Sequence, residues 1–160
     1  MRPAVFALAI FLATPASAAG LIWAGGQWAA IDRGSSCEAG ARSIRIAQKG
    51  KPQAHAGFAF DRGRNGQFFA QLSRVPRIGS TVVLTVGTQP FLLAGRGDWA
   101  WSTNRAQEAA IIAAARSGGG MRVESRDAAG RRFADRYLLD GAATAIDAAA
   151  AHCAGKMQRS

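Results

Sequence analysis

The chain has 160 residues, of which 20 are lysine or arginine and 10 are aspartate or glutamate, so its formal net charge at pH 7 is +10. This length suits one domain, and such a basic balance favours contact with anionic surfaces such as lipid, acidic glycans or nucleic acid. The basic residues are scattered, however, with no block of five, no basic heptad region and no aromatic-glycine signature of an RNA-binding platform. We therefore expect a solvated basic face and no nucleic-acid partner.

Residues 1–18 have the three parts of a secretory signal peptide. Met1-Arg2-Pro3 is a minimal positive segment, a charge-free apolar run follows at 4–13, and Ala16-Ser17-Ala18 is a small-x-small site for signal peptidase. The apolar run is too short to cross a hydrocarbon core of ~30 Å, which argues against the alternative of a membrane anchor. We expect cleavage between Ala18 and Ala19. The mature chain is then a single domain over residues 19–160 without a transmembrane segment, located in the periplasm, with outer-membrane association or secretion as alternatives.

The first half of the mature chain shows the two-residue hydrophobic period of half-buried strands. The pattern predicts strands at 27–32 and 42–47. It also predicts a hairpin of 57–61 with 67–72, in which Asn65-Gly66 forms a type I′ turn because that turn needs positive φ at both positions.

The second half continues this pattern. Strand 81–86 turns through Gly87-Thr88 into a return strand over 89–93. Pro90 has no N–H to donate, so this return strand is expected at a sheet edge, or to start after Pro90. Further strands are predicted at 98–101, 121–126 and 132–138. Short strands with closely spaced turns predict a β-sandwich or a small barrel.

Two helices interrupt the strands. The first is predicted to begin behind an Asn104 N-cap with Gln107 at N3 and to continue through the alanine-rich stretch 108–116. It is expected to end at 117–120, because glycine readily adopts the left-handed C′ conformation. The second is predicted from Asp140 or Gly141 to Cys153. Its apolar stripe is expected to consist of Ala142, Ile146, Ala149, Ala150 and Cys153.

The sequence has two cysteines, Cys37 and Cys153, near opposite ends of the mature chain. In an exported protein such a pair predicts a disulfide. A metal site needs further ligands, and His55 and His152 are the only histidines. His152 adjoins Cys153 and is a poor co-ligand from one helix face. The disulfide would hold the alanine-rich C-terminal helix, which packing alone would hold weakly.

No catalytic constellation is found in the sequence. The segment 95–100 lacks the last glycine of a dinucleotide fingerprint, the carboxylates are isolated, and neither Gly-x-Ser-x-Gly nor Ser-x-x-Lys occurs. We therefore predict no catalytic, cofactor-binding or metal-binding residue. The tryptophans are expected in the core and at its rim, with a carbohydrate or lipid site as the alternative; they are Trp23, Trp28, Trp99 and Trp101.

Three N-terminal features resemble the opening of the invasion-associated locus B family: Gly25-Gly26-Gln27-Trp28-Ala29-Ala30, then Cys37, then Ser43-Ile44-Arg45-Ile46-Ala47-Gln48. Similar segments follow at 82–86, 109–119, 121–125 and 133–142. The resemblance implies a mainly β, immunoglobulin-like β-sandwich with one inserted helix and a C-terminal helix, located in the periplasm or at the outer membrane of a Gram-negative bacterium and without enzymatic activity. Members often have further cysteines, so this chain would be a divergent, two-cysteine member, and a role in invasion is not assumed.

We expect an exported, monomeric, non-enzymatic protein of the cell envelope that needs no cofactor. It would bind an envelope protein or an anionic surface component through its basic face. The alternatives are a periplasmic hydrolase with an unrecognised site and an envelope-stress or assembly factor.

Overall fold

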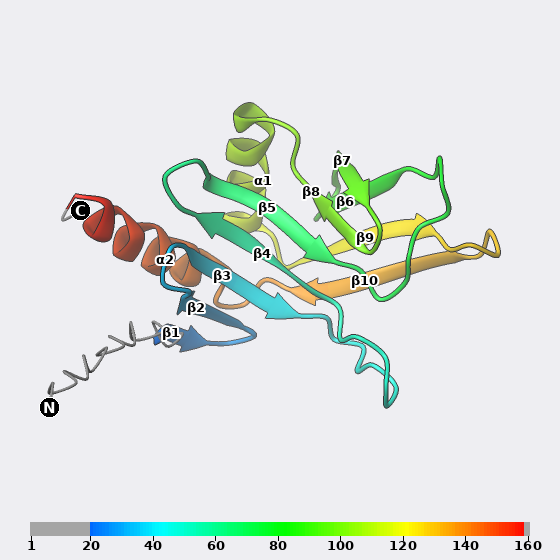
Figure 1. Ribbon diagram of the computed structural model, residues 1–160, viewed down its shortest axis with the longest axis horizontal. Coiled ribbons are helices and arrows are strands. Elements are labelled where there is room, and N and C mark those ends of the chain that lie inside the picture. The colour runs from blue at the N-terminus through cyan, green and yellow to red at the C-terminus, as the bar shows by residue number, and fades with distance from the viewer. Residues whose placement is uncertain (1–19, 159–160) are drawn as a thin grey trace, which may run out of the picture.

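The computed structural model describes residues 20–158, so the expected signal segment 1–18 and the Ala18-Ala19 cleavage site lie outside the described residues. Within them the chain is mainly β, as predicted, with two helices (Figure 1). The elements in chain order are β1 (Gly20–Gly25), β2 (Trp28–Asp32), β3 (Cys37–Arg42), β4 (His55–Phe60), β5 (Asn65–Gln71), β6 (Val82–Val86), β7 (Gln89–Arg96), β8 (Trp99–Trp101), α1 (Arg105–Ser117), β9 (Gly120–Arg126), β10 (Arg132–Leu138) and α2 (Ala142–Met157).

The strands form one ten-stranded antiparallel sheet in the order β1-β2-β3-β4-β5-β8-β7-β6-β9-β10. Strand β7 belongs to both halves of this sheet, because its residues 89–93 pair with β6 and its residues 94–96 pair with β8. Two contacts bring the last strand back toward the first half. The Ile44 N–H donates to the Arg136 carbonyl at 2.9 Å, and Trp28 Nε1 donates to the Leu138 carbonyl at 2.8 Å. The expected immunoglobulin-like sandwich is not confirmed, because the strands follow one continuous order and the sheet is not closed.

The core lies between the inner face of the sheet and the helices. Helix α2 packs on β2 and β3, and α1 packs on β5. The rings of Trp28, Phe58 and Phe68 follow one another across the first half of the sheet, with centroid separations of 6.0 Å and 5.6 Å. These aromatic residues supply much of the buried apolar surface of the core. The alanines of β2, β3 and α2 each bury far less.

A disulfide joins Cys37 of β3 to Cys153 of α2, as predicted, with the two Cα atoms 5.8 Å apart. Helix α2 runs four residues beyond Cys153, the point at which the prediction ended it. Its buried face also differs at one position, since Ala145 is buried where the prediction placed Ala150. The buried residues are Ala142, Ala145, Ile146, Ala149 and Cys153.

The predicted hairpin of β4 and β5 is present, but Asn65-Gly66 is not its turn. The chain turns at residues 61–64, where the Asp61 carboxylate accepts hydrogen bonds from the N–H groups of Gly63 and Arg64, both at 2.8 Å. Asn65 and Gly66 begin β5, and the positive φ of Gly66 (94°) coincides with a bulge in the ladder. The aspartate therefore fixes an earlier turn by satisfying two backbone donors.

The strand predicted at 42–47 is also wrong, because β3 ends at Arg42 and residues 43–54 form a loop. The Gln53 side chain competes with strand pairing there. Its Oε1 accepts from the Ala47 N–H at 2.8 Å, and its Nε2 donates to the Ser43 carbonyl at 3.2 Å. Strand β1 was not predicted as a separate strand.

Two further expectations fail on local geometry. Strand β7 is internal and contains Pro90, which the sheet accepts because β8 pairs only with residues 94–96 and leaves one side of Pro90 open. Helix α1 has the predicted Asn104 cap, whose side chain accepts from the Gln107 N–H, but Gly118 at its C-terminus is extended (φ −82°) rather than left-handed.

Candidate anion-binding face

Strands β9 and β10 bring four arginines together on one surface. In their ladder Arg126 lies opposite Arg132, and Arg122 lies opposite Arg136. The alternate residues of both strands, such as Val123 and Tyr137, are buried, so the arginines point away from the core. We call Arg122, Arg126, Arg132 and Arg136 the arginine face.

The arginine face carries an electrostatic cost. Like charges directly opposite each other on neighbouring strands destabilise a sheet, by about 0.2–1 kcal/mol per pair. Glu124 lies between the two pairs, opposite Ala134, and forms an ion pair with Arg122 at 2.7 Å. Arg132 and Arg136 form no ion pair within residues 20–158, so one carboxylate offsets only part of the repulsion.

The loop 72–81 is fixed against the turn between β9 and β10. The Arg77 N–H donates to the Arg126 carbonyl at 2.8 Å, and Pro76 forms an isolated bridge with Asp127. Arg74 Nη1 also donates to Asp127 Oδ2 at 2.9 Å. Desolvation of Asp127 opposes its ionisation, but hydrogen bonds from Arg131 and Arg74 hold the pKa of this carboxyl below its usual value. An ionised Asp127 thus ties two basic segments together.

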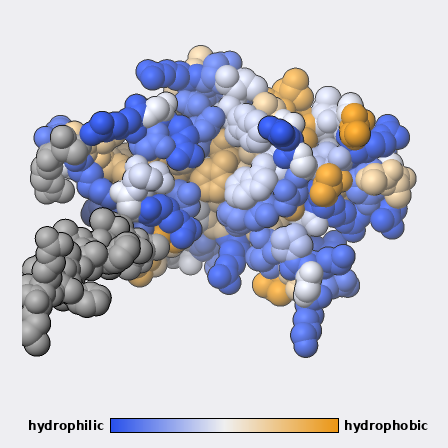
Figure 2. Space-filling view, in the orientation of Figure 1, coloured by the Kyte–Doolittle hydropathy of each residue, from blue (hydrophilic) through white to orange (hydrophobic). Residues whose placement is uncertain are grey.

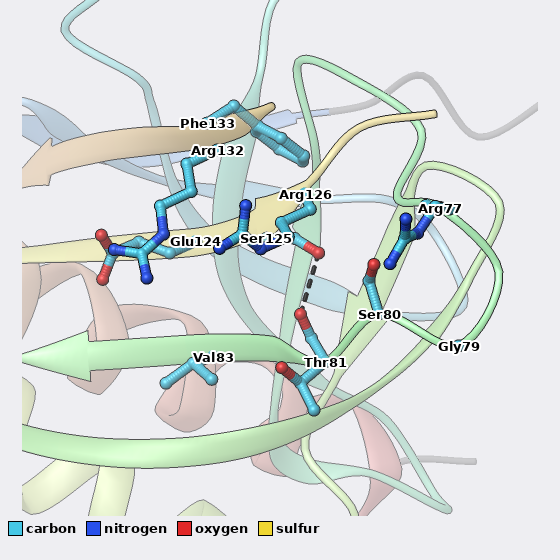
Figure 3. Close-up of a pocket in the computed structure, with 10 residues that line it drawn as sticks. All are labelled: Arg77, Gly79, Ser80, Thr81, Val83, Glu124, Ser125, Arg126, Arg132 and Phe133. Atoms are coloured by element: carbon cyan, nitrogen blue, oxygen red, sulfur yellow. Dashed lines mark hydrogen bonds between the residues drawn. The ribbon is translucent and has the colours of Figure 1, made fainter. Parts of the chain in front are cut away.

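An open hollow of about 460 Å³ separates this loop from the strands. Figure 3 shows Arg77 and Ser80 on the loop side, with Arg126 and Arg132 on the strand side. Arg132 leans toward Glu124 in this view, and Arg126 Nη1 donates to the Gly130 carbonyl at 2.9 Å. Guanidinium groups bind phosphate, sulfate and carboxylate through paired, charge-assisted hydrogen bonds. The hollow therefore has the chemistry of an anion site.

Ser80 adds a polar group to the same hollow. Its hydroxyl oxygen is buried and has no hydrogen-bond partner among the described residues. A buried hydroxyl without a partner is costly, and most such groups are satisfied by another polar atom. In Figure 3 the Ser80 hydroxyl points toward the Arg77 guanidinium, so an oxygen ligand held by that arginine would lie near the hydroxyl.

The structure separates the two histidines. The ring of His55 lies against the aromatic rings of Phe69 and Trp99, at centroid separations of 6.0 Å and 5.6 Å. His152 Nε2 contacts Asp32 Oδ2 at 2.9 Å at the other end of the molecule. Among residues 20–158 no three histidine, cysteine or carboxylate side chains form a group able to hold a metal ion.

The tryptophans divide between the core and the surface. Trp28 is buried, and Trp23 packs against the core in a partly buried position. Trp99 and Trp101 alternate with buried Ala100 and lie on the outer face of β8, where Trp99 is 39% exposed. Trp99 packs on His55 and Phe69 rather than offering a free ring face, which favours the rim interpretation over a carbohydrate site.

The arginine face was not predicted residue by residue, although its signal is in the sequence. Both predicted strands, 121–126 and 132–138, place arginine at alternate positions, in phase with the polar face. The strand period predicts a shared face, but only the register shows that arginine lies opposite arginine.

Comparisons of the chain with models of known protein families, with curated proteins and with solved structures found no match. Membership of the invasion-associated locus B family therefore stays a prediction. In the described part of the chain, neither helix is long and apolar enough to cross a bilayer.

Proposed function

We propose that this chain is an exported, non-enzymatic protein of the cell envelope that binds an anionic surface component through the arginine face. The observation that carries the proposal is the placement of two arginine pairs directly opposite each other on β9 and β10. Such pairs weaken the hairpin, and neutral polar residues would suit the same solvated positions at lower cost. A bound anion would turn this repulsion into attraction.

The residues around the arginine face support a role in binding rather than in solubility alone. Three arginines from two strands and one loop surround one hollow, and Glu124 is the acidic side chain that lines it. Concentrated charge of one sign raises the local concentration of oppositely charged partners and speeds their association. Evenly scattered arginines would keep the protein soluble without this concentration.

The envelope location is supported by covalent chemistry and by sequence. A disulfide between β3 and α2 suits an oxidising compartment. The predicted signal peptide over 1–18 and the resemblance to the invasion-associated locus B family point to the periplasm or the outer membrane. The immunoglobulin-like sandwich that the same resemblance implies stays a prediction.

The test compares the mature protein with an Arg126→Gln, Arg132→Gln double variant for binding to purified outer-membrane vesicles. Binding of the parent protein should fall steeply between about 0.01 M and 0.15 M salt, because screening weakens contacts between exposed charges. The double variant should bind weakly at either salt concentration. It should also unfold at a higher temperature, because it removes one cross-strand repulsion of about 0.2–1 kcal/mol.

Arg105→Gln is the control for net charge, since it removes one positive charge, half of what the double variant removes, from an exposed position on α1 outside the arginine face. It should leave vesicle binding close to that of the parent. A loss of binding free energy in the control of half the size found in the double variant, or larger, would show that net charge, rather than the arginine face, governs binding. Salt-independent binding by the parent would also contradict the proposal.

A further inference from the structure

The loop beside the arginine face holds an aliphatic side chain entirely in solvent. Ile78 is 100% exposed and Val75, three residues earlier, is 57% exposed. Single exposed aliphatic residues are common on protein surfaces. Here Val75 lies between Arg74 and Arg77 in the sequence, and Ile78 lies between Arg77 and Gly79, two residues that line the hollow.

Ile78 is held by a turn of defined geometry. The Ser80 N–H donates to the Arg77 carbonyl at 2.9 Å, which closes a four-residue turn with Ile78 and Gly79 at its centre. Gly79 has φ of 79°, the value that the third residue of a type II turn requires. The flanking Arg77 N–H is bonded to β9, so the turn presents Ile78 at a fixed position and does not fold it back onto the core.

The surface on the other side of the turn has the same mixed character. A second hollow of about 430 Å³ is lined by Ile78, Leu92 and Arg96, among others, and Leu92 is 59% exposed. At a separate place on the molecule, the loop 43–54 also carries an exposed aliphatic residue, Ile46, which is 80% exposed and lies between Arg45 and Lys49 in the sequence. Loops 72–81 and 43–54 both lie in the right-hand half of Figure 1, away from the C-terminal end of α2. Figure 2 shows hydrophobic residues set singly among hydrophilic ones on that side.

Exposed aliphatic side chains flanked by arginine and lysine suit binding to an anionic lipid bilayer. A bilayer with anionic lipids offers phosphate headgroups to the basic residues and an apolar interior to the aliphatic side chains. An acidic glycan or a soluble polyanion would satisfy the arginines and leave Ile78 in water.

We propose that the hollow between loop 72–81 and strands β9–β10 receives the phosphate of an anionic phospholipid, while Ile78 and Val75 enter the acyl boundary of the same bilayer. Arg77, Arg126 and Arg132 would hold the phosphate, and the Ser80 hydroxyl would donate to one of its oxygens. This inference rests on the proposed function and names lipid as the anionic component.

The experiment measures sedimentation of the mature protein with vesicles of two compositions: equal parts phosphatidylglycerol and phosphatidylcholine, and phosphatidylcholine alone. Binding should require phosphatidylglycerol. Ile78→Ser should weaken it about ten-fold, because a buried isoleucine side chain is lost from the bilayer contact. Arg132→Gln should weaken it about five-fold, the usual effect of one basic residue at an anionic membrane.

Leu21→Ser is the matched control for Ile78→Ser, since Leu21 is 70% exposed but lies on β1, outside both loops. It should bind vesicles as the parent does. Unchanged binding by Ile78→Ser, or equal losses in the two variants, would overturn insertion of the loop.

A parallel arm separates this inference from the proposed function. Soluble glycerol phosphate and a sulfated polysaccharide are added as competitors to the vesicle assay. Insertion predicts that millimolar glycerol phosphate leaves most vesicle binding intact, since it replaces the headgroup contact alone. If the outer-membrane vesicles of the earlier test are bound through Arg126 and Arg132 while phosphatidylglycerol vesicles are not bound, the lipid inference fails and the proposed function stands. If neither is bound, both fail.

Discussion

Removal of the disulfide should release helix α2 before it disturbs the sheet. The buried face of α2 consists of three alanines, one of which begins the helix, together with Ile146 and Cys153. Alanine buries little apolar surface, and an isolated helix of sixteen residues is only marginally stable in water. Attachment of α2 therefore depends strongly on the bond between Cys37 and Cys153.

The size of the effect follows from the length of the closed loop. The two cysteines are 116 residues apart in sequence, for which the chain-entropy model gives about 5 kcal/mol at 25 °C. This is an upper value, since a compact unfolded chain loses less entropy on cross-linking. If α2 and the strands unfolded together, a domain with an ordinary stability of about 5–15 kcal/mol would lose a large part of it. We expect α2 to open on its own, so that the loss falls on the helix and the strands keep their protection.

The assay is hydrogen exchange followed by mass spectrometry on the Cys37→Ser, Cys153→Ser double variant, with limited proteolysis in parallel. The double substitution avoids leaving one reactive thiol. Amides of α2 should exchange much faster and the helix should become cleavable, while the strands of the first half keep their order of protection. Ala154→Ser places the same hydroxyl one residue later, on the exposed side of α2, and should behave as the parent.

Two results would refute this reasoning. Unchanged protection of α2 in the double variant would show that packing alone holds the helix. Simultaneous loss of protection in α2 and in the strands would show that the disulfide stabilises the whole domain as one cooperative unit.

Three further variants test other parts of the fold. The hydrogen bond from Lys156, followed by that from the Gly34 N–H, lowers the pKa of Asp32 far below its usual value. The stability that this carboxylate provides is therefore present above about pH 4 and is lost as the pH falls further. Asp32→Asn should make the free energy of unfolding depend less on pH in the acid range, and an unaltered dependence would contradict this. Gly57→Ala should lower the free energy of unfolding in urea titrations by ~3 kcal/mol or more, because the new Cβ would lie 2.2 Å from a carbonyl oxygen of β3. At Gly119 a new Cβ would meet no atom within 4 Å, so Gly119→Ala should change the free energy of unfolding only slightly. Tyr137→Phe removes a buried hydroxyl without a partner in the described structure and should stabilise the protein by about 1 kcal/mol, so a lower urea midpoint would argue against it.

Local and covalent signals explain what the sequence could predict. The hairpins β6–β7 and β9–β10 were predicted because alternation and a short turn are both local. The Asn104 cap of α1 is equally local. The Cys37–Cys153 bond followed from there being two cysteines in a chain with a predicted export signal.

The errors arise where side chains compete with the strand pattern or where distant strands choose partners. Asp61 and Gln53 bind backbone groups and so place a turn and a loop where hydrophobicity alone suggested other boundaries. The order of strands around β7 is a long-range property. Nothing in the segment 89–96 shows that its two ends pair with different neighbours.

The candidate site shows the same division. Alternating arginines were visible in both strands, but their opposition depends on the register of the hairpin, which a one-residue slip would change. The exposure of Ile78 was even harder to predict from the sequence. An isoleucine before glycine in a loop is as compatible with a buried plug as with a solvent-exposed tip, and only the turn at 77–80 decides between them.

Stabilising and costly features are separated within this molecule. The disulfide, the buried face of α2 and the contact between Lys156 and Asp32 hold the helix to β2 and β3. The opposed arginines lie along the β9–β10 hairpin, where their repulsion makes folding less favourable, and the exposed Ile78 of the adjoining loop adds no buried surface to the fold. If the second group exists for binding, substitutions in the two groups should have opposite effects. Variants of the disulfide should lose stability and still bind vesicles while folded, whereas Arg132→Gln should gain stability and lose binding. Parallel changes of stability and binding in both groups would mean that the arginine face is part of the fold's support and not a surface kept for a partner.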